Sequence, residues 1–234
     1  IVENVAIKKT DPIFKNKNFL NIIQEQLSFF ESTYKINMPL ILLNSFNTHS
    51  QTEHFFKKEN KPFNAIIQNQ FPKIDTLSND PFISTVNPEQ EWNPPGHGDV
   101  FLALHESGWI DHLINDDKDY IFISNSDNIG ATIDISIPNY MAENNIDFLM
   151  ETTKKTKLDV KGGTLVRLNN KLTLLERAQV ETNHLPEFEN IQKFKIFNTN
   201  NIWINLKKLK NKMKENPFLL PLIANPKTVN NRNI

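Results

Sequence analysis

The chain alternates between segments with the apolar spacing of a helix and short, continuous apolar runs. Apolar residues recur every three to four positions over roughly residues 17–35, which predicts an amphipathic helix. The run from Met38 to Leu43 is apolar throughout and ends at Asn44, as expected of a strand buried on both faces of a parallel sheet. Similar patterns predict further elements: strands at 65–68, 120–125 and 148–152, a short helix capped by Ser50 and Glu53, a helix over about 99–113, a weaker helix over 131–144, a hairpin over 165–175 and a Lys-rich helix ending near 215.

This alternation of strands and helices predicts an α/β fold with a mostly parallel sheet. Such sheets bind ligands in the crevice beyond the carboxyl ends of their strands. Polar residues follow three of the predicted strands, at 44–48, at Gln68 and at 125–128. Residues 71–95 are rich in Pro, Asn, Ser and Asp without periodicity, which predicts a long loop.

Composition narrows the class of protein. A chain of 234 residues fits one domain, 1–234, and 38% hydrophobic residues provide a substantial core. The net charge of -1 gives no overall field toward nucleic acid or an anionic membrane, and no apolar run approaches the ~18 residues of a membrane span. The absence of Cys excludes disulfides and thiolate metal sites and agrees with a cytoplasmic location. The six His lack zinc-ligand spacing, and no Walker, dinucleotide or nucleophile-elbow motif occurs.

The segment from Pro94 to Asp99 combines paired prolines with Gly96 and Gly98. Prolines stiffen the approach and glycines let backbone come close to a flat ligand, so Gly96 and His97 are candidate binding residues. A rigid turn with Asp99 as a helix N-cap is an equally good interpretation of this segment alone.

Asn125 to Asn128 follow a predicted buried strand, so Asp127 is a carboxylate at the rim of the sheet. It could hold a hard cation such as Mg²⁺ or bind a sugar hydroxyl. Taken alone, an Asx-turn leading into the next element explains the segment better.

Three further segments carry chemistry with a simpler alternative beside each. Residues 159–164 place Lys161 and a diglycine before a strand, which suits contact with a phosphate or sugar, or a plain hairpin turn. The amides of 198–201 suit hydroxyl binding, or ordinary loop composition. Lys227 lies on a stiff turn after an apolar run, although a solvated lysine is the more usual reading.

Together these stretches resemble the eukaryotic UDP-glucose pyrophosphorylase (UTP–glucose-1-phosphate uridylyltransferase) family in collinear order over nearly the whole chain. The matching stretches are Pro39-Leu40 through Asn44-Ser45-Phe46-Asn47-Thr48, Trp92-Asn93-Pro94-Pro95-Gly96-His97-Gly98-Asp99, Ser124-Asn125-Ser126-Asp127-Asn128 with Gly130-Ala131-Thr132, Met150-Glu151-Thr152-Thr153-Lys154-Lys155-Thr156, Asp159-Val160-Lys161-Gly162-Gly163-Thr164, Leu174-Leu175-Glu176 with Ala178-Gln179-Val180, and Phe197-Asn198-Thr199-Asn200-Asn201 with Trp203-Ile204-Asn205. One such motif is a weak signal, whereas seven in order are specific.

The resemblance implies a GT-A-like, Rossmann-type nucleotidyltransferase domain with a mixed, mostly parallel sheet. It implies transfer of the uridylyl group of UTP to glucose 1-phosphate, giving UDP-glucose and pyrophosphate, with Mg²⁺ as cofactor. By the same resemblance, Gln68 and backbone around Gly96 hold uracil, and Lys227 reaches the reacting phosphate as a catalytic residue. Asp127 is expected near the metal and the nucleotide, in a catalytic and a binding role. The residues expected around nucleotide and sugar are His97, Asn125, Asp127, Gly163, Glu176, Asn198 and Asn200.

The sequence also departs from the family pattern. Ser126 stands where the family usually has Gly, which would crowd the nucleotide, and Ile67 and Asn69 differ from the usual neighbours of the uracil-binding Gln. The resemblance places a Gly-rich loop before Ile1 and a β-helix domain after Ile234, so we expect a fragment of a longer protein, whose oligomerisation stays open.

Two other functions compete with this one. A pyrophosphorylase that makes UDP-N-acetylglucosamine, or a broad range of UDP-sugars, shares the fold and several motifs. A non-catalytic nucleotide-sugar-binding fragment is the second alternative.

Overall fold

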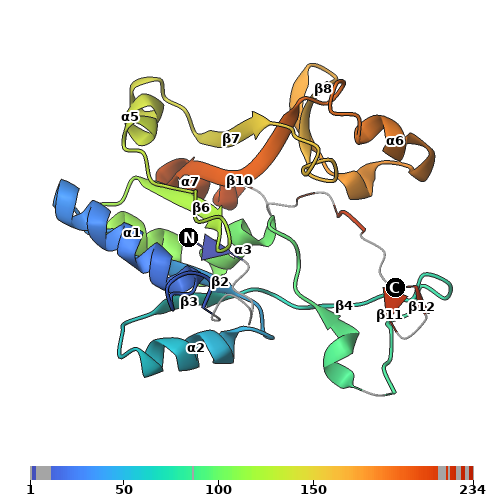
Figure 1. Cartoon of the computed structure of the whole chain (residues 1–234), viewed down its shortest axis with the longest axis horizontal. Helices are drawn as coiled ribbons and strands as arrows, with labels where there is room; N and C mark the ends of the chain where they lie inside the picture. The colour runs from blue at the N-terminus through green and yellow to red at the C-terminus, as the bar shows by residue number, and fades with distance from the viewer. Residues whose placement is uncertain are drawn as a thin grey trace.

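The computed structural model describes residues 2–3, 12–85, 87–215, 220, 222–224, 228–229 and 232–233. Six strands form the main sheet in the order β3-β2-β1-β6-β10-β7 (Figure 1). Their bounds are Val2–Glu3 (β1), Ile41–Asn44 (β2), Asn64–Ile67 (β3), Tyr120–Asn125 (β6), Phe148–Lys154 (β7) and Ile196–Asn205 (β10). The pairings from β3 to β6 are parallel, and β10 is antiparallel to both β6 and β7. The predicted mixed, mostly parallel α/β sheet is confirmed.

The strand β10 is the main element that the sequence pattern missed. It spans ten residues and lies between β6 and β7. Its apolar run is interrupted by Asn198, Asn200 and Asn201, and its register shifts between Asn198 and Ile202. The amides disguise the strand because they occupy an irregular stretch where the ladder is broken.

Helices cover both faces of this sheet (Figure 1). Side chains of Ile41 and Leu43 pack in the larger core cluster with residues of helices α3 (Asp99–Glu106), α4 (Trp109–Asn115) and α7 (Leu206–Glu215). Leu42 packs in a second cluster with residues of helices α1 (Phe19–Tyr34) and α2 (His49–Lys58). Successive strand residues point to opposite faces, so a strand covered on both sides must be apolar at every position.

Three helix predictions need correction. The helix expected over about 99–113 is two helices, because Gly108 has φ 76° and ends the first one. The helix expected over 131–144 is shorter, Ser136–Glu143 (α5), with Pro138 in its first turn, where its missing N–H has no intrahelical partner to lose. The capping box at Ser50 is wrong: α2 is preceded by Thr48, whose hydroxyl bonds to Ser45.

Residues 155–195 form a lobe beyond the ends of β7 and β10, which we call the β8–β9 lobe (Figure 1). It holds the predicted hairpin, Thr164–Leu168 (β8) paired with Lys171–Leu175 (β9), two short 3₁₀ helices, Arg177–Gln179 (η3) and Thr182–His184 (η4), and a short helix, Leu185–Phe188 (α6).

The expected loop over 71–95 is largely irregular. It contains a two-residue ladder, Phe71–Pro72 (β4) with Trp92–Asn93 (β5), and a 3₁₀ helix, Pro88–Glu91 (η2). A second small ladder joins Thr228–Val229 (β11) to Arg232–Asn233 (β12). None of the helices in the described residues has the length and hydrophobicity that crossing a membrane requires.

Candidate functional site

Asn200 brings together two candidate residues that are far from it in sequence. Its Nδ2 donates a hydrogen bond to Oδ1 of Asn125 at 3.0 Å and lies 3.3 Å from Nδ1 of His97. Asn125 ends β6, and His97 precedes α3. With the amide of Asn200 as donor, Nδ1 of His97 accepts, so its Nε2 carries the hydrogen and is a donor. The three side chains therefore meet at the carboxyl end of β6.

The three Asn side chains in the irregular stretch of β10 make different hydrogen bonds. Asn200 has φ 60°, a left-handed conformation that Asn tolerates, and its backbone N–H donates to Oδ1 of Asn198 at 2.9 Å. Asn201 is buried and donates to Oε2 of Glu151 on β7 at 2.6 Å. Asn198 thus stabilises the turn, Asn201 anchors it to β7, and Asn200 faces His97 and Asn125.

Gly163 and Glu176 lie against each other beside this turn. The carbonyl of Gly163 accepts from the backbone N–H of Asn198 at 3.0 Å. A Cβ built on Gly163 would lie 2.8 Å from Cδ of Glu176 and 3.0 Å from its Oε2, so only glycine leaves the carboxyl group its place. Burial raises the pKa of Glu176, while the nearby His97 and Lys155 act in the opposite direction. This carboxylate is thus partly desolvated within reach of the Asn200 cluster.

Gln68 and Gly96 lie at the other end of the candidate site. The backbone N–H of Gln68 donates to the carbonyl of Asn44 at 2.8 Å, which continues the β2–β3 ladder by one residue. Within the described part of the chain, the side-chain amide of Gln68 makes no hydrogen bond. A Cβ built on Gly96 would meet no atom within 4 Å, so its backbone faces open space. Both residues can receive a ligand.

Asp99 is not the N-cap of α3: the helix begins at Asp99, and Gly98 precedes it. The carboxylate of Asp99 accepts instead from Asn69, from its backbone N–H at 3.3 Å and from its Nδ2 at 3.4 Å. Burial raises the pKa of Asp99, and the hydrogen bonds from Asn69 oppose that shift. This contact fixes the residue after Gln68 to the helix that follows His97.

Asp127 is exposed on the loop after β6, next to the buried Ser126. The same loop is held by Asn128, whose Nδ2 lies 3.4 Å from Oδ1 of Asn201. No group of three or more His, Asp or Glu side chains in the described residues could hold a metal ion by itself.

The family model for UTP--glucose-1-phosphate uridylyltransferase matches residues 6–234. The chain belongs to this family.

Members of the uridylyltransferase family from distant eukaryotes are similar to the chain over nearly its whole length. UTP--glucose-1-phosphate uridylyltransferase 2 of Dictyostelium discoideum is 43% identical over 97% of the chain and 46% of its own length. The uridylyltransferase of Saccharomyces cerevisiae is 41% identical over 96% of the chain and 46% of its own length. The chain spans about half the length of the curated relatives it matches.

Solved structures with the same fold carry related names. UDP-glucose phosphorylase from Trypanosoma brucei superposes with a TM-score of 0.89 at 38% identity, covering 96% of this chain and 51% of that one. A mutant UDP-glucose pyrophosphorylase from Leishmania major, in complex with UDP-glucose, superposes with a TM-score of 0.83 at 35% identity, with the same coverage of both chains.

Among the predicted site residues, His97 and Asn125 meet at Asn200, and Gly163 contacts Glu176 and Asn198. Gln68 follows β3, Asp127 lies on the loop after β6, and Gly96 directly precedes His97. The Oδ1 of Asn198 accepts from the backbone of Asn200 in the turn. Lys227 falls outside the described residues.

Sequence reasoning missed the supporting residues of the site. Asn201 belonged to a recognised amide block, but nothing local distinguished it from the exposed amides. Lys155 lay within a matching stretch, and a lysine just after a strand is normally solvated. Asn69 differs from the residue that the family usually has beside the uracil-binding Gln, and its sequence position gives no sign of its contact with Asp99. The partners of Asn201 and Asn69 are distant in sequence, and Lys155 meets Gly162 and Phe188 only because the β8–β9 lobe folds back on β7, so no local signal could have found these roles.

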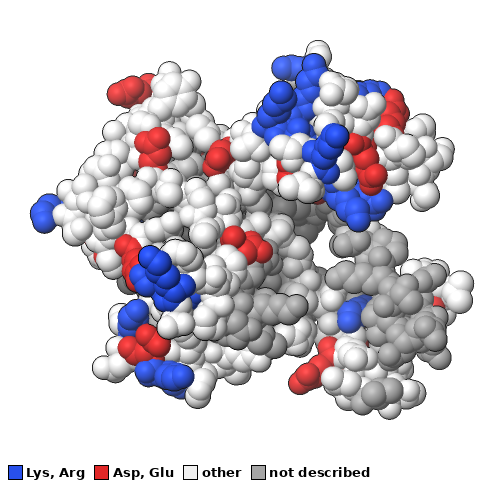
Figure 2. Space-filling view, viewed as in Figure 1, with Lys and Arg blue, Asp and Glu red and all other residues white. Residues whose placement is uncertain are grey.

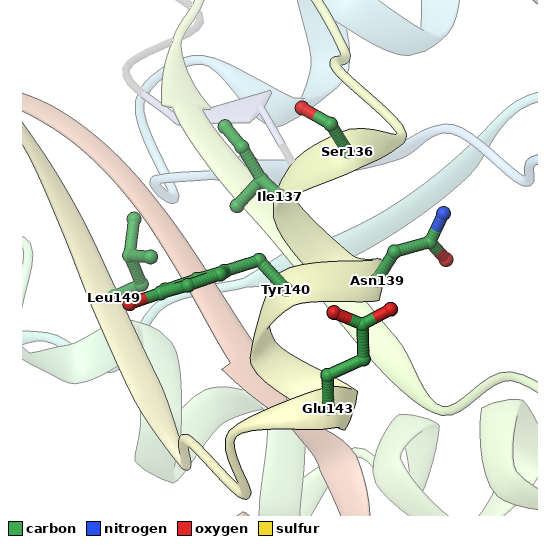
Figure 3. Close-up of a pocket in the computed structure, with 6 residues that line it drawn as sticks. All are labelled: Ser136, Ile137, Asn139, Tyr140, Glu143 and Leu149. Carbon is green, nitrogen blue, oxygen red and sulfur yellow. The ribbon is translucent and has the colours of Figure 1, made fainter.

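Two cavities in the described part of the chain are lined by residues other than Asn200, His97 and Asn125. One of about 540 Å³ opens between α5 and β7, where the ring of Tyr140 lies beside Leu149 and the carboxyl group of Glu143 lies on the side of Asn139 (Figure 3). Another of about 180 Å³ lies between α1 and the sheet, and its lining is mostly apolar.

Proposed function

We propose that residues 1–234 form the nucleotidyltransferase domain of a UTP–glucose-1-phosphate uridylyltransferase, which makes UDP-glucose and pyrophosphate. The observation that carries this proposal is the bond network of Asn200, His97 and Asn125 at the carboxyl end of β6. It lies between Gln68 on one side and the Gly163–Glu176 contact on the other. Family membership and the names of the relatives support the same reaction.

A GT-A-like, Rossmann-type domain agrees with the topology. The parallel half of the sheet, from β3 to β6, is covered by helices on both faces (Figure 1), and Gln68, Asn125 and Asp127 lie at the carboxyl ends of β3 and β6. Ligands of open α/β sheets bind at that edge.

Each side chain has a chemical task in this proposal. The amide of Gln68 can donate to a uracil oxygen and accept from the ring N–H, and the open backbone at Gly96 lets the flat base approach. Nε2 of His97 is a donor for a phosphate or sugar oxygen. The carboxylate of Glu176 accepts hydrogen bonds from sugar hydroxyls.

The reaction is an in-line displacement. An oxygen of the sugar phosphate forms a bond to the α-phosphorus of UTP, the bond from that phosphorus to the bridging oxygen breaks, and pyrophosphate leaves with the electron pair. No protein nucleophile is required, so catalysis rests on positioning and on stabilising negative charge. In this scheme Lys227 provides a cation at the reacting phosphate.

Mg²⁺ fits the donors at this edge. Proteins bind Mg²⁺ through one or two carboxylates together with substrate phosphates, and Asp127 is an exposed carboxylate on the loop after β6. Asp127 would hold the ion, which neutralises triphosphate charge when bound.

The test is a substrate panel with the complete gene product. We expect kcat/KM with UTP to be at least about tenfold higher for glucose 1-phosphate than for N-acetylglucosamine 1-phosphate or galactose 1-phosphate, as for pockets that reject an analogue with unpaired polar groups. Equal rates for all three sugars would favour a broad-specificity UDP-sugar pyrophosphorylase. UDP-glucose binding without turnover would favour the non-catalytic alternative.

A pair of variants, one inside and one outside the candidate site, tests whether the activity depends on this site. His97→Ala should lower kcat/KM, because it removes one donor, whereas His54→Ala, at an exposed position on α2, should leave it unchanged. Equal effects of the two changes would separate the activity from this cluster.

A further inference from the structure

Lys155 is a buried cation that the reaction above does not use. Its side chain is only 3% exposed and lies just after the last residue of β7. Its Nζ donates to the carbonyl of Gly162 at 3.1 Å and lies 4.6 Å from the ring centroid of Phe188 on α6. A buried lysine is rare unless partners compensate its charge. Here the carbonyl and the aromatic face do so together with the negative charges of Asp159, Glu189 and Glu176.

The β8–β9 lobe joins the sheet at the end of β7 (Figure 1), and Lys155 is the residue that follows this strand. Its backbone N–H donates to the carbonyl of Lys195 at 2.7 Å, so the two ends of the lobe meet there. The hydroxyl of Thr164 adds a bond to the carbonyl of Ile196 at 2.7 Å. The side chain of Lys155 then reaches into the lobe and holds it at Gly162.

Gly162 and Gly163 are fixed on several sides. A Cβ on Gly162 would collide with the ring of Phe197, and a Cβ on Gly163 would collide with the carboxyl group of Glu176. The carbonyl of Gly163 is bonded to Asn198, and the carbonyl of Gly162 to Lys155. Contacts with Phe197 and Asn198 therefore fix the position of the diglycine relative to β10, and the hydrogen bond from Lys155 to Gly162 adds a further constraint.

The two ends of the candidate site differ in what they can bind. Gln68 follows β3, an edge strand, whereas Gly163 and Asn198 lie at β10, next to the opposite edge. A ligand with its base at Gln68 therefore presents its sugar to the lobe.

The charge of the lobe agrees with this arrangement. It carries eight Lys and Arg against five Asp and Glu, and Figure 2 shows basic side chains gathered over it. Such a field favours the approach of a sugar phosphate.

We propose that Lys155 is a positioning residue for the sugar phosphate: it holds Gly162 and Gly163 so that Glu176 and Asn198 keep their places at the sugar. This inference rests on the proposed function. A side chain that served folding alone would change stability and leave the balance between the two substrates unaltered. A positioning role changes that balance, because the uracil end at Gln68 lies outside the lobe.

Three variants of the complete gene product test this proposal. Lys155→Met keeps the length and the apolar stem but leaves the Gly162 carbonyl without its donor. Lys155→Arg keeps the cation, and Lys154→Met removes the neighbouring exposed charge as a matched control. The readouts are KM for glucose 1-phosphate and for UTP, Kd for UDP and for UDP-glucose, and Tm.

Lys155→Met should raise the KM for glucose 1-phosphate about tenfold and raise the Kd for UDP-glucose by a similar factor, as expected when a hydrogen bond to a charged group is lost. The KM for UTP and the Kd for UDP should change by less than about threefold, because the uracil end is untouched. Lys155→Arg and Lys154→Met should both stay close to wild type.

Equal losses for both substrates in Lys155→Met, or a lower Tm with an unchanged ratio of KM values, overturn the proposal. If Lys155→Met does not fold, Phe188→Leu decides: a selective rise in the KM for glucose 1-phosphate supports the role, and an unchanged ratio overturns it. A wild-type protein that forms no UDP-glucose refutes the proposed function and this inference with it. An active wild type, with Lys155→Met behaving as Lys154→Met does, refutes the inference alone.

Discussion

Replacing Gly163 with alanine places a methyl group where the carboxyl group of Glu176 lies. The Cβ would be 2.8 Å from Cδ of Glu176, whereas non-bonded carbons prefer about 3.5–4.0 Å. The carboxyl group must therefore retreat by about 1 Å. Because it is the far end of a flexible side chain, it can move without unfolding the β8–β9 lobe.

The expected effect on activity is large and the effect on stability small. A misplacement of about 1 Å in a binding constellation can cost on the order of 10²-fold, so kcat/KM for UDP-glucose formation should fall between about 10- and 100-fold. Gly163 does not have a positive φ, so alanine fits its backbone and itself stabilises by about 0.4–1 kcal/mol through the unfolded state. We expect the free energy of unfolding to change by less than about 1 kcal/mol, a shift of roughly 2–4 °C in Tm.

The assay measures kcat/KM and Tm for four proteins: wild type, Gly163→Ala, Glu176→Ala and the double variant. Gly130→Ala serves as a matched control, since a Cβ there would meet only Oδ1 of Asn128 at an ordinary 3.5 Å. If Gly163→Ala acts by moving Glu176, it should cost little further activity once Glu176 is absent.

Two results would refute this reasoning. A loss from Gly163→Ala that is the same with and without the Glu176 carboxylate would show that the methyl group acts elsewhere. A comparable loss in Gly130→Ala would show a general sensitivity of these loops to alanine.

Three other predictions concern single residues. Burial raises the pKa of Glu176 above 4.5 in the folded protein, so stability should fall as the pH rises from about 4.5 through the raised pKa. The Tm of Glu176→Gln minus the Tm of wild type should therefore be larger at pH 7 than at pH 4.5. A difference in Tm that does not change with pH would contradict the shift. Gln68→Leu leaves the polar edge of uracil unpaired, so the kcat/KM preference for UTP over CTP and ATP should shrink by about 1–3 kcal/mol, whereas a lower Tm with unchanged preference would assign Gln68 a structural role. Asn200→Gly and Asn200→Ala should both lower kcat/KM about tenfold, because each removes the amide shared by His97 and Asn125. Only the alanine variant is strained at φ 60°, so its free energy of unfolding, measured by urea titration, should be about 1 kcal/mol lower.

The sequence by itself determined the class of the fold and the strand ends that carry part of the site. Strand β2 is buried on both faces, and Ile121 and Ile123 of β6 lie in the larger core cluster while Phe122 stacks on Trp203, so both apolar runs are continuous and easy to recognise. The polar residues after them, Asn44 and Asn125, marked the carboxyl edge. These features can be read locally, because a buried strand requires apolar side chains at its own positions.

Only the tertiary structure decided how the candidate residues meet. Asn200 lies 75 residues from Asn125 and 103 from His97, and the three come together because β10 inserts antiparallel between β6 and β7. The burial of Lys155 likewise depends on Gly162 and on Phe188 of α6, within a lobe that folds back on the end of β7. Pattern along the chain reports which residues are buried by their own element, whereas these contacts arise from pairing between elements that are distant in sequence.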